Sequence, residues 1–147
     1  MTSDEHAFVP RYRLRRGARR QTRPIPNRDQ YRIQALALNE RIEREQMSVV
    51  TTRAVVFEIG NFLSASALRT TGACYLEALE EDPRVEIVSL TAELFRNAFT
   101  LYRERPDKTW SLTDCLSFTV MRRRGLTNAL TGDVHFEQAG FNALLRE

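Results

Sequence analysis

Residues 109–141 read TWSLTDCLSFTVMRRRGLTNALTGDVHFEQAGF, and two carboxylates in this stretch stand alone among mostly apolar residues. Asp114 is the only formal charge in residues 109–121. Asp133 is the only one in residues 125–136 when histidine is counted as neutral. Burying an unpaired carboxylate is costly, so each of these acids requires either solvent or a partner that compensates its charge.

The first acid lies at the predicted start of a helix. Ser111 and Asp114 have the spacing of a capping box, in which the serine caps the helix and the acid lies in its first turn. Residues 112–121 then place mostly apolar side chains at helical spacing. Three arginines follow and Gly125 provides a stop, so the sequence predicts a helix between these two ends.

The second acid follows a short run that is consistent with a buried strand, residues 129–131. Gly132 comes next, so Asp133 would lie just past the carboxyl end of that strand. In open α/β sheets, this edge is where ligands bind. Each acid also has a purely structural interpretation, since Asp114 could serve only the capping box and Asp133 could be an ordinary turn aspartate.

A third isolated acid favours the functional interpretation. Glu58 is the only charged residue in a predicted helix over residues 54–68, and no basic side chain of that helix lies at helical spacing from it. It could be partly exposed, paired with an arginine from elsewhere, or kept ionised by a bound cation. Thr113 and Asn61 are candidate hydrogen-bond donors to these acids, and Asp107 is a candidate for a more distant contact or a surface acid.

The composition is that of a globular protein with one domain. The chain has 147 residues, of which 42% are hydrophobic and 28% are charged, and this length allows a proper core. Cys74 and Cys115 lack metal-ligand spacing and are expected to be buried thiols in a reducing cytosol. No apolar run approaches the roughly 20 residues that span a bilayer, and no signal-peptide pattern is present. These features predict a cytoplasmic protein.

The excess positive charge is confined to the start of the chain. Residues 1–32 hold nine arginines and three acids, a balance of +6, whereas residues 33–147 hold 13 Lys and Arg against 16 Asp and Glu, a balance of −3. Residues 1–26 are therefore predicted to be an arginine-rich arm, either poorly ordered or RNA-binding. Residues 27–147 are predicted to form the folded domain.

The rest of the chain alternates between helix and strand patterns. Helices are expected over residues 27–46, 54–68, 73–81 and 91–105, and strands over residues 48–51 and 85–90. Thr52 and Thr91 are the expected caps of two of these helices. Strands separated by helices predict a parallel sheet with helices on both faces, in which the three acids could converge at one edge.

Three carboxylates suggest a hard divalent cation. Oxygen ligands suit Mg²⁺ or Mn²⁺ and are poor for zinc, which also requires His or Cys. A cation held in this way can lower the pKa of water and neutralise a phosphoryl group, as in metal-dependent nucleases. His135 is interpreted as a packed residue or a substrate contact rather than a ligand. We find no Ser–His–Asp elbow, phosphate-binding glycine loop or histidine cluster that would indicate another chemistry.

Three motifs stand out in the last third of the chain: WSLTDC at residues 110–115, ALTGDVHF at 129–136 and AGF at 139–141. With them, the chain resembles the PIN domain over residues 27–145, and most closely the VapC-type toxin nucleases of bacterial toxin–antitoxin pairs. This resemblance implies a three-layer α/β/α sandwich and an Mg²⁺- or Mn²⁺-dependent endoribonuclease that is silenced by a cognate antitoxin and forms a homodimer. By the same resemblance, the metal ligands and catalytic residues are Glu58, Asp114 and Asp133.

The start of the chain departs from this family. Members open with an apolar strand that ends in a metal-binding aspartate, whereas HAFV at residues 6–9 is followed by Pro10 and then by arginines. The N-terminal strand is therefore expected to be degraded, and the loss of one of four carboxylates should weaken metal binding. Two functions stay open: an impaired ribonuclease, or a catalytically silent PIN-like module that binds antitoxin or RNA. We hypothesise that a frameshift replaced the segment after Val9, which translating the coding DNA in its other frames would test.

Overall fold

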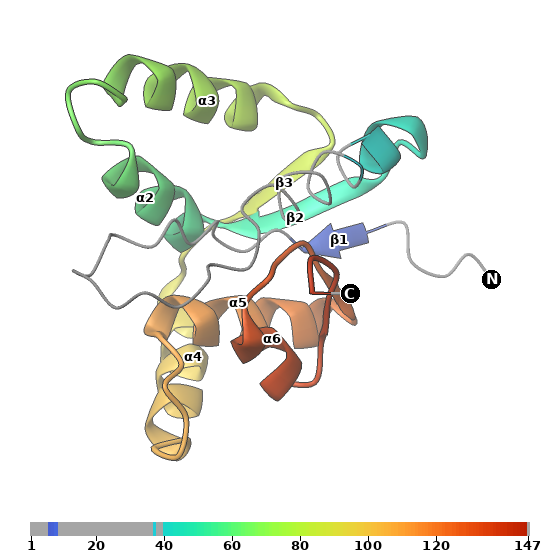
Figure 1. Ribbon diagram of the computed structural model, residues 1–147. Coiled ribbons are helices and arrows are strands. Elements are labelled where there is room, and N and C mark those ends of the chain that lie inside the picture. The colour runs from blue at the N-terminus through green and yellow to red at the C-terminus, as the bar shows by residue number, and fades with distance from the viewer. Residues whose placement is uncertain (1–5, 9–36, 38–39, 147) are drawn as a thin grey trace, which may run out of the picture.

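The computed structural model describes residues 6–8, 37 and 40–146. They form a parallel sheet that is flanked by helices (Figure 1). The helices with assigned bounds are α2 (Arg53–Phe62), α3 (Arg69–Glu81), α4 (Ala92–Glu104), α5 (Leu112–Arg124) and α6 (Val134–Gln138). In the view of Figure 1, α4, α5 and α6 lie below the strands, whereas α3 lies above them and α2 to their left. The predicted α/β fold with a parallel sheet is confirmed.

The sheet has the strand order β3-β2-β1-β4-β5, and each neighbouring pair is parallel. The strands are β1 (His6–Phe8), β2 (Ser48–Thr52), β3 (Val85–Val88), β4 (Asn128–Ala129) and β5 (Asn142–Ala143). Phe8 of β1 is in register with Val50 on one side and with Ala129 on the other. Because these strands share one direction, the carboxyl ends of β1, β2 and β4 meet at the same edge of the sheet.

The strands agree with the sequence pattern in position but not in length. β2 is rich in β-branched residues and nearly all buried, as expected for a strand that is covered on both faces. β3 ends at Val88 rather than at residue 90, and β4 shares only Ala129 with the predicted run over residues 129–131. β5 was not predicted, because a strand of two residues carries no periodic signal.

β1 lies within the segment that was predicted to be an arm. Although it has only three residues, it pairs with strands on both sides and is the central strand of the sheet. β1 lies within HAFV at residues 6–9, the stretch that resembles the family's first strand. That this strand is degraded relative to the family stays a prediction. Most of the remaining segment lies outside the described residues, so the division of the chain after residue 26 stays a prediction.

Three helices begin at the caps that the sequence predicts. The Thr52 hydroxyl accepts from the Val55 N–H at 3.3 Å, and the Thr91 hydroxyl accepts from the Leu94 N–H at 3.1 Å. The third cap, at the start of α5, belongs to the site described below. Gly125 ends α5 with φ 66°, a left-handed conformation that glycine adopts without strain.

The predicted helix over residues 54–68 is wrong at its carboxyl end, because α2 stops at Phe62. The Ser64 hydroxyl donates a 2.8 Å hydrogen bond to the Gly60 carbonyl, an acceptor that a continuing helix would use for a backbone N–H. α3 begins at Arg69, earlier than the predicted residue 73. For the helix predicted over residues 27–46, residues 37 and 40–44 are helical and most of the remainder lies outside the described residues.

The core is centred on α5. Its buried residues are Cys115, Leu116, Ser117, Phe118, Val120 and Met121. The Phe118 ring meets Trp110 at 5.0 Å and Phe136 at 4.9 Å between centroids, both edge to face, an arrangement that aromatic rings favour. α4 packs on the same core through Leu94 and Ala98, whereas Phe95 is exposed.

α3 contributes little to the core, because Gly72 is its only buried residue. Cys74 on this helix is exposed, which corrects the expectation of a buried thiol, whereas Cys115 is buried as predicted. Both cysteines are free. No helix in the described part of the chain is long and apolar enough to cross a membrane.

Candidate active site

Asp114 is fixed by the first turn of α5. Its backbone N–H donates to the Ser111 hydroxyl at 3.0 Å, and its Oδ2 accepts from the Ser111 N–H at 2.8 Å. This is the capping box that the sequence predicts. The cap uses Oδ2, so the same carboxylate keeps its second oxygen for another partner. The side chain is 19% exposed.

Asp133 is fixed by the turn that follows β4. Its N–H donates to the Thr131 hydroxyl at 3.0 Å, and its Oδ1 accepts from the His135 N–H at 3.0 Å. Asp133 is therefore the N-cap of α6, a helix that was not predicted. The cap orients the carboxylate at the carboxyl edge of the sheet, where the sequence argument placed it.

His135 lies between the two aspartates. Its Nδ1 is 3.2 Å from Asp114 Oδ2 and 3.5 Å from Asp133 Oδ1. Its other ring nitrogen, Nε2, is 3.1 Å from the Thr109 hydroxyl. The sequence analysis interpreted His135 as a packed residue or a substrate contact, and it did not anticipate this contact with the two aspartates. The available signal was its position two residues after Asp133, within the first turn of a helix that this aspartate caps.

The structure brings two of the three predicted ligands together. Asp114, Asp133 and His135 each offer one atom, and these atoms lie within 4.8 Å of one another. Glu58 is not part of this group. Its Oε1 accepts a 2.8 Å hydrogen bond from the hydroxyl of Thr113, the residue that precedes Asp114. Glu58 therefore contacts the neighbour of Asp114. Asn61, the other candidate donor, is exposed on α2.

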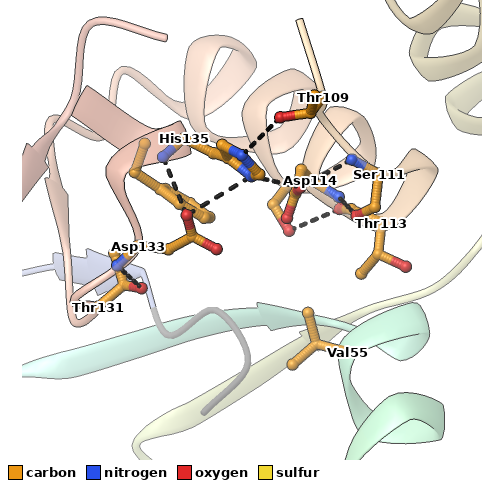
Figure 2. Close-up of a pocket in the computed structure, with 10 residues that line it drawn as sticks. Val55, Thr109, Ser111, Thr113, Asp114, Thr131, Asp133 and His135 are labelled. Carbon is orange, nitrogen blue, oxygen red and sulfur yellow. Dashed lines mark hydrogen bonds and ion pairs between the residues drawn. The ribbon is translucent and has the colours of Figure 1, made fainter. Parts of the chain in front are cut away.

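A pocket opens over this group (Figure 2). Its lining residues are Val55, Thr109, Ser111, Thr113, Asp114, Ser117, Thr131, Asp133, His135 and Phe136. Five of the ten carry hydroxyl groups, and the only formal charges that they bring at neutral pH are the two carboxylates when His135 is neutral. Such a pocket offers oxygen and nitrogen donors to a divalent cation, and it offers hydroxyl donors to anionic oxygens.

The two site aspartates differ from the acids on the surface. Asp107 accepts two 2.8 Å hydrogen bonds from the Arg105 guanidinium, which lower the pKa of this exposed carboxyl to about 2. Glu80 pairs with Arg53 in the same way. Among the described residues, the ion-pair partner of Asp114 and Asp133 is the imidazole of His135, not a guanidinium. A cation could therefore approach these carboxylates without displacing any arginine of the described residues.

The fold and the site together define an α/β protein with a carboxylate–imidazole site at the carboxyl edge of a parallel sheet. The PIN domain family matches residues 25–142, and the chain belongs to this family.

A solved structure with a similar fold is that of VapC20 from Mycobacterium tuberculosis, described as a toxin that cleaves the sarcin–ricin loop. The two chains are 22% identical, the match covers 93% of this chain and 97% of that one, and the TM-score is 0.66. Identity this low shows a shared fold. No curated protein matches the chain at a significant level.

Proposed function

We propose that this protein is a divalent-metal-dependent endoribonuclease and the toxin of a toxin–antitoxin pair. The observation that carries the proposal is the meeting of Asp114, Asp133 and His135 at the carboxyl edge of a PIN-type sheet. The structural similarity to VapC20 supports the toxin assignment, because that protein of the same fold is described as a toxin that cleaves the sarcin–ricin loop.

The residues of the site fit a hard divalent ion, Mg²⁺ or Mn²⁺. Within the described residues, Asp114 Oδ1 and Asp133 Oδ2 accept no hydrogen bond, so each carboxylate keeps one oxygen for a cation. We propose Asp114 and Asp133 as direct ligands and Glu58 as the third carboxylate, which contacts the ion directly or through water. When bound, the ion would supply charge neutralisation at a phosphate and a water of lowered pKa.

The side chains of this site are preorganised by hydrogen bonds within the chain. The Ser111 N–H and the His135 N–H each hold one oxygen of an aspartate, so the carboxylates lose little freedom on binding. The Thr113 hydroxyl donates to Glu58 Oε1 and so holds this carboxylate beside the first turn of α5. The remaining hydroxyl groups of the pocket can donate to phosphate or ribose oxygens of an RNA strand.

The proposed partners are an RNA substrate, a cognate antitoxin protein and a second copy of the chain. A stacked row of rings on α4 supports the homodimer: Phe95 lies 6.0 Å from Phe99, and Phe99 lies 6.4 Å from Tyr102. All three side chains are exposed, and exposed apolar rows of this kind mark association surfaces. Sedimentation of the purified chain tests this part, since a monomer at micromolar concentration would contradict it.

A catalytically silent module is the alternative function, and one observation favours it. β1 lies between β2 and β4, and its carboxyl end at Phe8 lies at the edge of the sheet that carries the site. Along the sequence, Pro10 and a series of arginines come after Val9, and no carboxylate follows until Asp29. A site with one acid fewer would bind a cation more weakly, and the chain could then bind RNA or antitoxin without cleaving.

RNA cleavage by the purified chain, with Asp114→Asn beside it, separates these functions. Asparagine keeps an oxygen that can accept the Ser111 N–H bond, so the cap of α5 survives while the negative charge is lost. We expect cleavage of a sarcin–ricin loop fragment with Mn²⁺ or Mg²⁺, none with a chelator, and a loss in Asp114→Asn of more than the roughly 10–100-fold that an outer partner contributes.

Asp107→Asn is the matched control, because Asp107 is an exposed acid that is paired with Arg105. It should cleave like the wild type. Cleavage that resists the chelator, or that survives in Asp114→Asn, would remove the nuclease proposal. Absence of cleavage with every metal, together with retained binding of RNA or antitoxin, would establish the silent module.

A further inference from the structure

His135 has the position of a metal ligand. Its Nδ1 lies 3.2 Å from Asp114 Oδ2 and 3.5 Å from Asp133 Oδ1. Around an octahedral ion with bonds of about 2.1 Å, neighbouring ligand atoms are about 3.0 Å apart. The ligand atoms that the three side chains offer lie within 4.8 Å of one another. A small movement would therefore let the imidazole join both carboxylates in holding one ion, with Asp114 Oδ1 and Asp133 Oδ2 free of the cap hydrogen bonds.

The hydroxyl of Thr109 allows His135 to present either form of its ring. A hydroxyl both donates and accepts, so its 3.1 Å contact with Nε2 suits two tautomers. In one, Nδ1–H donates to the carboxylates and the threonine donates to Nε2. In the other, Nε2–H donates to the threonine and the Nδ1 lone pair faces the carboxylates. In the second form, the Nδ1 lone pair and the carboxylate oxygens would repel one another unless a cation lay between them. A neutral imidazole with a free Nδ1 lone pair is the form that binds a metal.

The ring is held in place by the helix that carries it. The His135 N–H is bonded to Asp133 Oδ1, and the next residue, Phe136, is buried in the aromatic core beside Phe118. The His135 side chain itself is only 14% exposed. A ligand that is fixed in this way loses little conformational entropy when it binds a metal ion, which favours a direct role over an incidental contact.

We propose that His135 Nδ1 is a direct ligand of the divalent ion and makes the site prefer Mn²⁺ over Mg²⁺. This inference rests on the proposed metal site. It distinguishes Mn²⁺ from Mg²⁺, which the carboxylates alone do not. Mg²⁺ binds almost entirely through oxygen, whereas an imidazole nitrogen suits the first-row transition ions. The competing role is purely structural, with His135 acting only as a donor that spaces the two aspartates.

Pulsed electron paramagnetic resonance of bound Mn²⁺ tests the proposal on the wild-type chain. A directly bound imidazole should give a strong ¹⁴N coupling to Mn²⁺, which a histidine that only hydrogen-bonds to the carboxylates would not give. His135→Gln should lose this coupling and bind Mn²⁺ at least about 10-fold more weakly, whereas its Mg²⁺ affinity, measured by competition, should change less. Thr109→Val should weaken Mn²⁺ binding by a smaller factor, because only the outer hydrogen bond is lost.

Thr100→Val is the matched control for Thr109→Val, because the Thr100 hydroxyl bonds to the Arg96 carbonyl of its own helix, away from the pocket. It should bind Mn²⁺ like the wild type. Wild-type Mn²⁺ binding without ¹⁴N coupling would overturn the proposal and leave the nuclease function intact, as would an equal loss of both ions in His135→Gln. If the wild type bound neither ion, both proposals would be wrong.

Discussion

Helices α5 and α3 have the same length but very different roles in the fold. Each has 13 residues, yet α5 buries six of them, whereas α3 buries only Gly72. α5 carries Asp114 and lies against the aromatic core. α3 supports α2, the helix that carries Glu58. One side of the site, the core wall, is therefore formed by α5. The other side is formed by α2, which packs with α3 in a lightly packed helical hairpin, residues 53–81 (Figure 1).

This difference bears on how the ligands are held. Asp114, Asp133 and His135 are tied to one another and to helix caps by short contacts. Glu58, on α2, accepts a hydrogen bond from the Thr113 hydroxyl of α5. Elements with few buried contacts open at low free energy, so we expect α2 and α3 to fluctuate more than α5. Glu58 is the part of the site whose distance from the aspartates can vary most.

The largest effect should come from truncating the centre of the core wall. Phe118 is fully buried and contacts three other rings, so Phe118→Ala should lower the free energy of unfolding by about 3–5 kcal/mol. Tyr75→Ala removes a ring from α3 that is 47% exposed, and should cost less than about 1 kcal/mol. Urea unfolding of both variants measures the contrast, and similar losses would show that the hairpin is packed as firmly as the core.

A smaller effect should come from the contact between α2 and α3. A Cβ added at Gly72 would lie 2.7 Å from the Leu63 Cβ, which cannot move without its backbone. Gly72→Ala should therefore push the two helices apart and cost about 1–3 kcal/mol. Hydrogen exchange should rise in α2 and not in α5.

Gly60 provides the matched control on the facing helix. A Cβ there would meet only Leu76 Cδ1, the end of a flexible side chain, at 3.4 Å. Gly60→Ala should be neutral or should stabilise the chain by up to about 1 kcal/mol, because alanine favours a helix over glycine. Thermal unfolding of the pair provides the measurement, and a greater loss in Gly60→Ala than in Gly72→Ala would contradict the packing described for this hairpin.

The smallest perturbation is chemical labelling of the two thiols, which requires no mutation. Burial, and to a lesser extent the negative charge of the neighbouring Asp114 carboxylate, raise the pKa of the Cys115 thiol to about 11. At pH 8, only about one Cys115 thiol in a thousand would be ionised even if reagent could reach it. Cys74 is exposed on α3.

A thiol reagent at pH 8 should therefore modify one cysteine quickly in the native protein and the second only after denaturation. The Cys115 rate should rise with pH toward 11, since the thiolate is the reactive form. Rapid labelling of both thiols in the native state would mean that α5 opens as readily as α3, and the contrast between the two helices would then be lost.

Local signals predicted much of this fold correctly. The Thr52, Thr91 and Ser111 caps and the Gly125 stop each depend on neighbouring residues, so their sequence spacing sufficed. Helix ends that depend on weak local preferences were not predicted correctly, as at Phe62, where α2 ends. β5 and α6 were too short to give a pattern, because their pairing and packing stabilise them rather than their composition.

The acids themselves were visible in the sequence, because an isolated carboxylate in an apolar run stands out wherever it lies. Asp114, Asp133 and Glu58 could be named on that ground alone, and the cap that holds Asp114 could be named with it. The sequence could not show which of these acids lie close together, because contacts between residues 19 or more positions apart depend on how the sheet orders its strands. The strand order places β4 next to β1 and sets the turn after it beside α5. That packing brought His135 between two aspartates and left Glu58 beyond the Thr113 hydroxyl.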